Sequence, residues 1–254
     1  MSLELNKYLK NLDRIEVVMT LACTGKCKHC QNGEPENTKD HIDASAVIKA
    51  IREVNEFYKI KTVMTFGGEP LLYPDDVCAI HKAATECDIP RRQIITNGYF
   101  SKDQKRIEEV VRRLAESGVN DLLLSVDAFH QETIPLGPVK YFAERVVKAG
   151  IPARISPAWL VSEDDNNPYN VRTRQIIAEF EPYRIPVCEG NVIFPSGNAL
   201  KYLREYFDDG VTEWSEYDED PEDVRTLSFM PDGGVLDGNA YTTDILDIIR
   251  EYKP

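Results

Sequence analysis

The chain has 254 residues and a formal net charge of −13, and 42% of its residues are hydrophobic while 29% are charged. This length and balance fit one large α/β domain with an appendage and do not indicate disorder. The acidic balance argues against a nucleic-acid substrate, because phosphate backbones are bound through clustered Lys and Arg.

The predicted elements alternate between short β-branched strands and amphipathic helices. In chain order we expect strands at residues 14–20, 62–66, 93–96, 122–126, 153–161 and 185–194, alternating with helices at residues 46–58, 74–86, 101–117, 139–148 and 170–180. Asp43 or Ser45 is available to cap the first helix. Ser101 and Gln104 form a capping box for the third helix, which Gly118 ends. Strands and helices in this order indicate parallel β/α units. Six units fall short of the eight of a closed barrel, so we predict an open, partial (β/α)6 barrel of the TIM type.

The tail at residues 201–254 is expected to lie outside a barrel core at residues 1–200. It is predicted to contain an acidic loop, a hairpin with a turn at residues 231–234 and a closing helix near residues 245–249. Residues 208–223 hold nine carboxylates and no Lys or Arg, which is typical of a solvated loop or of a docking site for a basic partner.

Three cysteines follow the first predicted strand on one short loop. Cys23, Cys27 and Cys30 have C-x3-C-x2-C spacing, and the run Gly67-Gly68-Glu69-Pro70 follows the second strand. Three thiolates on one turn suit three irons of a 4Fe-4S cluster and leave the fourth iron without a protein ligand. An iron without a protein ligand can bind a substrate or a cofactor.

A structural zinc site is the alternative use of these thiols, with His29 or His41 as the fourth ligand of a Cys3His site. The next cysteines, Cys78 and Cys87, do not follow at the spacing of a zinc framework, and we interpret them as core residues of the second helix. The zinc site also leaves the glycine-rich run unexplained.

The cysteine spacing and the glycine-rich run together resemble the radical S-adenosylmethionine (radical SAM) superfamily. The resemblance implies a partial barrel that holds a 4Fe-4S cluster, with Cys23, Cys27 and Cys30 as its ligands, and S-adenosylmethionine (SAM) bound at the open iron. It also implies that one electron cleaves SAM to methionine and a 5′-deoxyadenosyl radical, which abstracts hydrogen from a substrate. His29 would lie beside the adenine, and Gly67, Gly68, Glu69 and Pro70 would hold the methionine amino group.

Other polar residues near strand ends are candidates for contacts with SAM or substrate. Asn97 and Ser125 stand where the family contacts ribose and the methionine carboxylate, although capping or turn formation would explain each as well. Arg154 is a candidate partner of the SAM carboxylate unless it lies at the outer end of its strand. Asp127 and His130 point to a loop above the barrel that could bind substrate or transfer a proton.

Cys188, on the sixth predicted strand, could donate a hydrogen atom to a substrate radical or could be an ordinary core cysteine. Residues 194–199 resemble the Pro-x-Gly-Arg-Ala segment that precedes SPASM/twitch extensions, with Asn198 in place of the arginine. No cysteine follows Cys188 in the sequence. We therefore predict that the tail holds no auxiliary cluster and that the tail itself caps the open barrel.

We therefore predict a radical SAM enzyme, an oxidoreductase acting on a peptide or small metabolite, with an electron donor such as flavodoxin or ferredoxin. One alternative is a glycyl-radical-enzyme activating enzyme, and another is a noncatalytic iron-sulfur or zinc-binding module. Thiolate chemistry of this kind belongs in a reducing compartment, so a cytoplasmic location is expected. Residues 1–7 form no apolar leader, and no run approaches the roughly 18 apolar residues of a membrane span.

Overall fold

The computed structural model describes residues 6–215 and 218–254. Its centre is a six-stranded sheet in which every neighbouring pair of strands is parallel. In spatial order the strands are β5 (Ala153–Ser156), β4 (Asp121–Ser125), β3 (Arg91–Thr96), β2 (Thr62–Phe66), β1 (Arg14–Val18) and β8 (Thr226–Phe229). This sheet confirms the predicted α/β class and partial TIM-like barrel.

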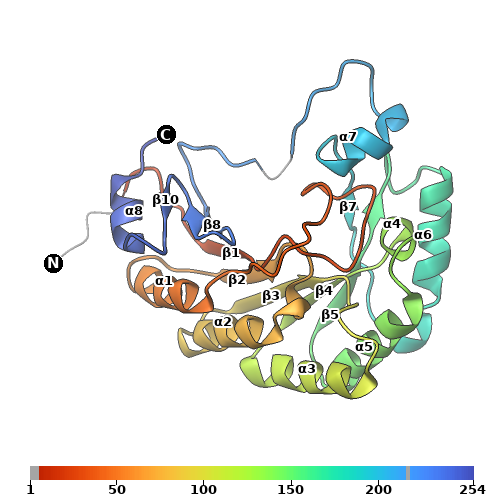
Figure 1. Ribbon diagram of the computed structural model, residues 1–254, viewed down its shortest axis with the longest axis horizontal. Coiled ribbons are helices and arrows are strands. Elements are labelled where there is room, and N and C mark those ends of the chain that lie inside the picture. The colour runs from red at the N-terminus through yellow and green to blue at the C-terminus, as the bar shows by residue number, and fades with distance from the viewer. Residues whose placement is uncertain (1–5, 216–217) are drawn as a thin grey trace.

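Helices cover the outer face of the sheet and leave the strand ends open to loops (Figure 1). The covering helices are α1 (Ala44–Phe57), α2 (Pro74–Glu86), α3 (Gln104–Ser117) and α5 (Leu136–Lys148). Asp43 caps α1 as predicted, and Gly118 ends α3 in the left-handed conformation. The cap of α3 differs from the prediction. Asp103, not Ser101, accepts the hydrogen bond from Lys105 N, while the Ser101 hydroxyl accepts from Asp103 N.

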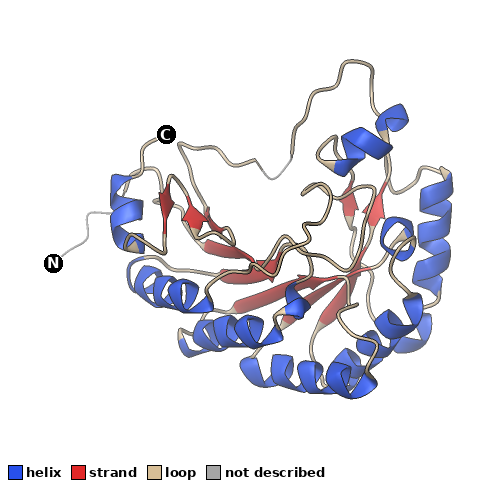
Figure 2. Cartoon of the chain, viewed as in Figure 1, coloured by secondary structure: helices blue, strands red, loops and turns tan. Residues whose placement is uncertain are grey.

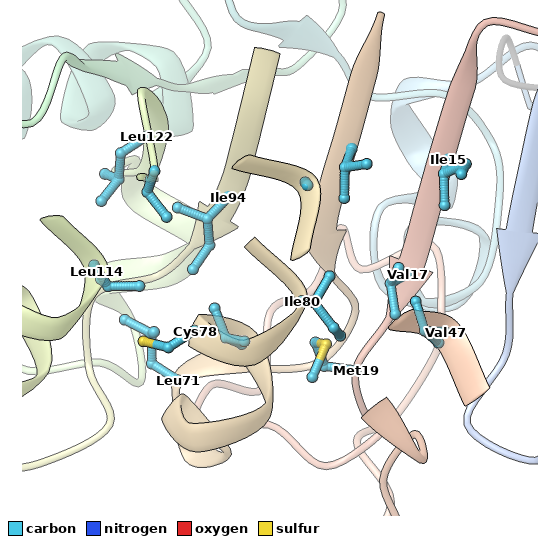
Figure 3. Close-up of a cluster of buried hydrophobic side chains, with 14 of the residues drawn as sticks. Ile15, Val17, Met19, Val47, Leu71, Cys78, Ile80, Ile94, Leu114 and Leu122 are labelled. Atoms are coloured by element: carbon cyan, nitrogen blue, oxygen red, sulfur yellow. The ribbon is translucent and has the colours of Figure 1, made fainter. Parts of the chain in front are cut away.

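The hydrophobic core fills the space between this sheet face and the helices (Figure 3). Ile15 and Val17, two residues apart in β1, are fully buried there together with Val47 of α1. The period of two in the strand and the helical period in α1 bring these apolar faces together. Cys78 of α2 lies in the same cluster, which confirms that it is a core residue.

The sixth strand of the sheet is not the one that the sequence predicted. Residues 185–194 form a single bridge, between Ile155 and Val187, and the two-residue strand β7 (Asn191–Val192), which pairs with β6 (Ala158–Trp159). Pro186 lacks an amide donor and Gly190 has a φ of 73°, so this stretch cannot continue a regular ladder. The strand β8 of the tail takes the sixth place, parallel to β1.

The tail lies along β1 and α1 instead of across the strand ends (Figure 1). Met230 N donates to Gly234 O at the predicted turn, but β8 belongs to the main sheet and β9 (Gly234–Val235) pairs with β10 (Gly238–Asn239). The closing helix α8 (Ile245–Glu251) is anchored to α1 by an ion pair of 2.7 Å between Lys49 and Asp244.

The rest of the chain forms mostly short elements joined by loops (Figure 2). The short elements are η1 (Pro70–Leu72), α4 (Ala128–Gln131), α6 (Pro168–Ala178), η2 (Glu181–Tyr183), α7 (Asn198–Tyr202) and η3 (Arg204–Tyr206). The acidic run forms the loop between η3 and β8, and Glu213 in it accepts a hydrogen bond from Gly197 N. Residues 216 and 217 of this run and residues 1–5 of the N-terminus lie outside the described residues. Within residues 6–215 and 218–254, no helix is long and apolar enough to cross a membrane.

Candidate active site

The loop between β1 and α1 places all three motif cysteines at the carboxyl ends of the parallel strands. Cys23, Cys27 and Cys30 have free thiols and line one pocket. His29 of the same loop and His130 also line the pocket. Residues at or just beyond the ends of β2, β3 and β4 complete the lining: Gly67, Gly68, Asn97 and Ser125. Active sites of parallel β/α barrels lie at this end of the strands.

The two glycines after β2 let the chain pass directly under the start of the cysteine loop. Gly68 N donates to Thr20 O at 2.7 Å, and Glu69 N donates to Ala22 O at 2.9 Å. A Cβ on Gly68 would lie 2.0 Å from Ala22 O, and Gly67 has a φ of 121°. Glycine is therefore required at both positions by close backbone contact and by conformation.

The Glu69 side chain points into the scaffold and not into the pocket. Its side chain is fully buried, and its carboxylate accepts hydrogen bonds from Leu71 N at 2.9 Å, the Thr96 hydroxyl at 2.7 Å and Asn97 N at 2.9 Å. These bonds tie the ends of β2 and β3 together. The carboxylate therefore holds the floor of the pocket, and in this arrangement it does not face a ligand there.

The stability of the metal-free chain should report on this buried carboxyl group. Burial raises the pKa of Glu69 from 4.5 to about 7, against the three hydrogen bonds that lower it. A carboxyl whose pKa rises on folding binds its proton more tightly in the native state, so its contribution to stability falls between pH 4.5 and about 7. The wild type and Glu69→Gln should therefore differ in their dependence of stability on pH. As the pH rises through this window, the unfolding free energy of the wild type should fall by about 3 kcal/mol relative to that of the variant. Urea titrations at stepped pH measure it, and a constant difference would contradict the raised pKa.

Asn97 joins the end of β3 to the cysteine loop. Its side-chain amide lies 3.6 Å from Cys23 Sγ and donates to the Thr24 hydroxyl at 3.1 Å, while its carbonyl accepts from Tyr99 N at 2.8 Å. Ser125, at the end of β4, also lines the pocket. The structure thus places both predicted residues beside the cysteines.

His29 is half-buried and has its ring within an aromatic cluster. Its centroid lies 5.0 Å from the rings of Phe129 and of His130, and its Nδ1 is buried without a hydrogen-bond partner in the described residues. Burial lowers the pKa of His29 to about 4, so the ring is neutral. A neutral ring on the pocket wall, with one unpaired polar nitrogen, suits contact with a planar, polar ligand group.

Asp127 and His130 are brought together at the start of α4. Asp127 Oδ1 accepts from His130 N at 2.9 Å, and its Oδ2 lies 2.8 Å from His130 Nδ1. Burial works to raise the pKa of Asp127, but the charge of His130 together with the hydrogen bonds from its ring and backbone amide and the charge of His29 outweighs it, and the pKa falls to about 2. His130 lines the pocket, whereas Asp127 stands behind it and is fully buried.

Burial also keeps cysteine thiols of the metal-free loop protonated. It raises the pKa of Cys23 to about 12, with the Glu69 carboxylate adding to the shift, and it raises the pKa of Cys30. Metal ligation requires thiolates, so loading this loop releases protons.

Alkylation of the metal-free chain tests this protonation. At pH 8, Cys23 should react with iodoacetamide more than about tenfold more slowly in the folded chain than in urea, because the thiolate is the nucleophile. The folded rate should still rise about tenfold per pH unit up to pH 10, where the unfolded thiol levels off. Peptide mass spectrometry gives the rates. Equal rates in the folded and unfolded chains would contradict the raised pKa.

Two predicted residues lie away from the pocket. Arg154 pairs with Asp121 at 2.7 Å, and Asp121, as the first residue of β4, marks the opposite end of the strands from the cysteines. Arg154 therefore has a carboxylate of the chain as its partner and does not line the pocket, as expected for a residue at the outer end of its strand. Cys188 is half-buried, its amide donates to Ile155 O at 2.9 Å, and it does not line the pocket either.

The first residue of α7 holds the cysteine loop from the other side, a contact that the sequence did not predict. The Asn198 amide donates to Cys27 O at 3.0 Å and to Gly33 O at 3.1 Å, and Asn198 N donates to Cys30 O at 2.9 Å. Its signal in the sequence was the likeness of residues 194–199 to Pro-x-Gly-Arg-Ala. The asparagine at that position now has a function, since it fixes two of the three cysteines by their backbone carbonyls.

The donor set fits a 4Fe-4S cluster, because three free thiols of one loop line one pocket. His41 cannot be the fourth ligand of a zinc site with these cysteines, because it lies outside the pocket. Its ring stacks on Tyr73 at a centroid distance of 3.9 Å and pairs with Asp76. His29 remains a candidate zinc ligand, since the ligand atoms of Cys27, His29 and His130 lie within 4.8 Å of one another.

Comparisons with known proteins agree with this geometry. The sequence profile of the Radical SAM superfamily matches residues 17–155. The GTP 3′,8-cyclase of Nautilia profundicola is 26% identical over 153 residues, which cover 57% of this chain and 44% of that protein. A putative glycyl-radical enzyme activating enzyme of Methanocaldococcus jannaschii is 32% identical over 101 residues, which cover 40% of this chain and 38% of that one. The matches span less than half the length of these curated relatives.

The fold has solved relatives as well. Streptococcus suis SuiB, bound to its precursor peptide SuiA, superposes with a TM-score of 0.63 at 15% identity, covering 96% of this chain and 65% of that one. The family match covers more than half of the chain, and the chain belongs to the radical SAM superfamily. This is a superfamily of enzymes that use a 4Fe-4S cluster and SAM.

Proposed function

We propose that Cys23, Cys27 and Cys30 ligate the 4Fe-4S cluster, that SAM binds in the rest of the same pocket, and that the chain cleaves SAM to begin radical chemistry. The observation that carries the proposal is the convergence of three free cysteines with the ends of β2, β3 and β4 on one pocket. When bound, the cluster would supply the electron for reductive cleavage of SAM, which would begin hydrogen abstraction from the substrate.

The residues of the pocket divide into those that would contact SAM and those that position others. Gly67 and Gly68 keep the backbone open to a ligand, and Asn97 and Ser125 offer polar groups at the next two strand ends. Glu69 acts through the scaffold, because its carboxylate is already occupied by three donors.

The substrate class that we propose is a peptide or a small metabolite. Relatives and structural neighbours include a GTP 3′,8-cyclase and a peptide-bound enzyme, and the acidic surface does not suit nucleic acid. The electron would come from a separate low-potential donor such as flavodoxin or ferredoxin, in a reducing compartment such as the cytoplasm.

An activating enzyme for a glycyl-radical protein is the second candidate, favoured by the 32% identity to the Methanocaldococcus jannaschii relative. It would place a stable radical on a partner protein and not on a small product. An electron paramagnetic resonance (EPR) signal of a glycyl radical on a candidate partner would select this function over the first.

Anaerobic turnover tests the main proposal. The chain is reconstituted with iron and sulfide, reduced with dithionite and given SAM, and 5′-deoxyadenosine and methionine are quantified by chromatography. Both products should form in equal amounts and only with reductant present. SAM that stays intact on a fully loaded, reduced chain would overturn the proposal.

A further inference from the structure

Tyr169 of α6 contacts the cysteine loop in two ways, although it lies 141 residues beyond Lys28 in the chain. Its hydroxyl accepts a hydrogen bond from Lys28 Nζ at 3.2 Å. Its ring stacks on Phe129 of the neighbouring helix α4, with centroids 4.6 Å apart and an angle of 14° between the rings (Figure 1). The Phe129 ring lies 5.0 Å from the ring of His29. Tyr169 therefore reaches two consecutive residues that stand between the second and third motif cysteines.

Phe129 links the ring of Tyr169 to the ring of His29. It is fully buried in a small hydrophobic cluster that also contains Cys27 and Leu160, and Tyr169 packs against this cluster. The parallel Tyr169 ring covers one face of Phe129. Without that ring a cavity would remain beside Phe129, and the neighbouring side chains would relax into it only in part. Phe129 would then no longer hold the His29 ring in one orientation.

The hydroxyl and the ring of Tyr169 act on different residues of the loop. Lys28 Nζ also donates to Glu132 Oε1 at 3.0 Å, so Lys28 keeps an anchor when the hydroxyl is removed. His29 lines the pocket, and the rings beside it are those of Phe129 and His130. The ring of Tyr169, and not its hydroxyl, is therefore the group that bears on the orientation of His29.

We propose that Tyr169 is a positioning residue for SAM: through Phe129, its ring holds the His29 ring against the part of the pocket that the adenine would occupy. A side chain that is already fixed in its binding orientation does not have to be ordered when the ligand arrives, so the affinity is higher. Tyr169 does not line the pocket, and it takes no part in the cleavage of SAM. This inference rests on the proposed function of the pocket.

SAM binding to the reconstituted, reduced chain tests the inference, with the dissociation constant taken from the SAM-dependent change of the cluster's EPR signal. In Tyr169→Leu this constant should rise about fivefold, within the range of one aromatic contact. Iron content and the rate of deoxyadenosine formation at saturating SAM should stay close to those of the wild type. Tyr169→Phe keeps the ring and should bind SAM within about twofold of the wild type.

Tyr183→Leu is the matched control, because Tyr183 is also half-buried and in contact with one other ring, that of Phe180, outside the pocket. It should leave the affinity for SAM unchanged. A variant that is merely destabilised would contain less loaded chain, but the loaded fraction would keep its affinity.

A second readout needs no cluster, because diethyl pyrocarbonate modifies accessible imidazole rings. In the metal-free chain, His29 should react about threefold faster in Tyr169→Leu than in the wild type, since its ring is held less tightly. His41 stacks on Tyr73 outside the pocket and should react equally in both chains. Mass spectrometry of the tryptic peptides 29–39 and 40–49 measures the two histidines separately.

Unchanged SAM affinity in loaded Tyr169→Leu, or unchanged reactivity of His29 in the metal-free variant, would overturn the inference and leave the proposed function intact. Equal losses of affinity in Tyr169→Leu and Tyr169→Phe would also overturn it, because the hydroxyl would then be the group that matters. If Tyr169→Leu does not load, the metal-free reactivity decides.

If Tyr169→Leu does not fold, Tyr169→Met is measured in its place, because methionine fills the space without a planar face. Failure of both variants to fold would overturn the inference, since it gives Tyr169 no part in the fold. A wild-type chain that takes up no 4Fe-4S cluster, or whose cluster does not respond to SAM, would instead refute the proposed function itself.

Discussion

Replacing Gly68 with alanine is expected to abolish cluster binding and to destabilise the fold by about 3 kcal/mol or more, at or beyond the upper end of the usual cost of overpacking. The new Cβ would lie 2.0 Å from Ala22 O and 2.6 Å from Ala22 C. Both are backbone atoms, so no side-chain rotation relieves the clash. The chain must instead move apart where Gly68 N and Glu69 N hold Thr20 and Ala22, which shifts Cys23 out of the pocket.

Gly137→Ala is the matched control for this substitution. A Cβ at Gly137, in the first turn of α5, meets nothing within 4 Å. Alanine there should be neutral or should stabilise by about 0.5 to 1 kcal/mol, because it restricts the unfolded chain. Urea unfolding and iron content are measured on both variants. Normal iron uptake by Gly68→Ala would show that cluster binding does not need the close contact between the Gly68 backbone and the start of the cysteine loop.

Replacing Cys27 with alanine is expected to reduce bound iron from about four atoms per chain to near zero, and deoxyadenosine formation to below detection. Cys27 is the most buried of the three motif cysteines, and its carbonyl is fixed by Asn198. Without Cys27 the loop keeps only two of the three thiolates that would hold the cubane.

Cys87→Ser provides the control, because Cys87 is a half-buried residue that caps the end of α2 outside the pocket. Its variant should load iron and cleave SAM like the wild type. Iron, sulfide and the visible absorption of the cluster are measured after identical anaerobic reconstitution. A Cys27→Ala chain with full iron and SAM cleavage would remove this cysteine from the ligand set.

Local patterns predicted the parts of the fold that depend on local interactions. The second strand was predicted at residues 62–66 and is found at Thr62–Phe66, and the second helix was predicted at residues 74–86 and is found at Pro74–Glu86. Periodicity and the flanking glycines and prolines are enough to define such elements. The cysteine loop and the glycine pair were likewise predicted from adjacent residues. Asn97 and Ser125 became candidates through the family resemblance, and the structure places all of these residues on one pocket.

Contacts between distant segments could not be predicted in this way. The pairing of β8 with β1 joins residues more than 200 positions apart, and nothing in either strand names its partner. Whether Arg154 lies at the pocket end or at the outer end of its strand depends on the register between β5 and β4. The hold of Asn198 on Cys27 requires residues 195–199 to be folded back over the loop, which the sequence of neither segment encodes.

The most direct test of the account is the EPR spectrum of the reduced, reconstituted chain with and without SAM, recorded together with metal analysis. We expect a 4Fe-4S signal that changes when SAM binds at the iron that the three cysteines leave open. A chain that instead binds one zinc ion, or a cluster whose signal is indifferent to SAM, would contradict it and leave a metal-binding module without radical chemistry.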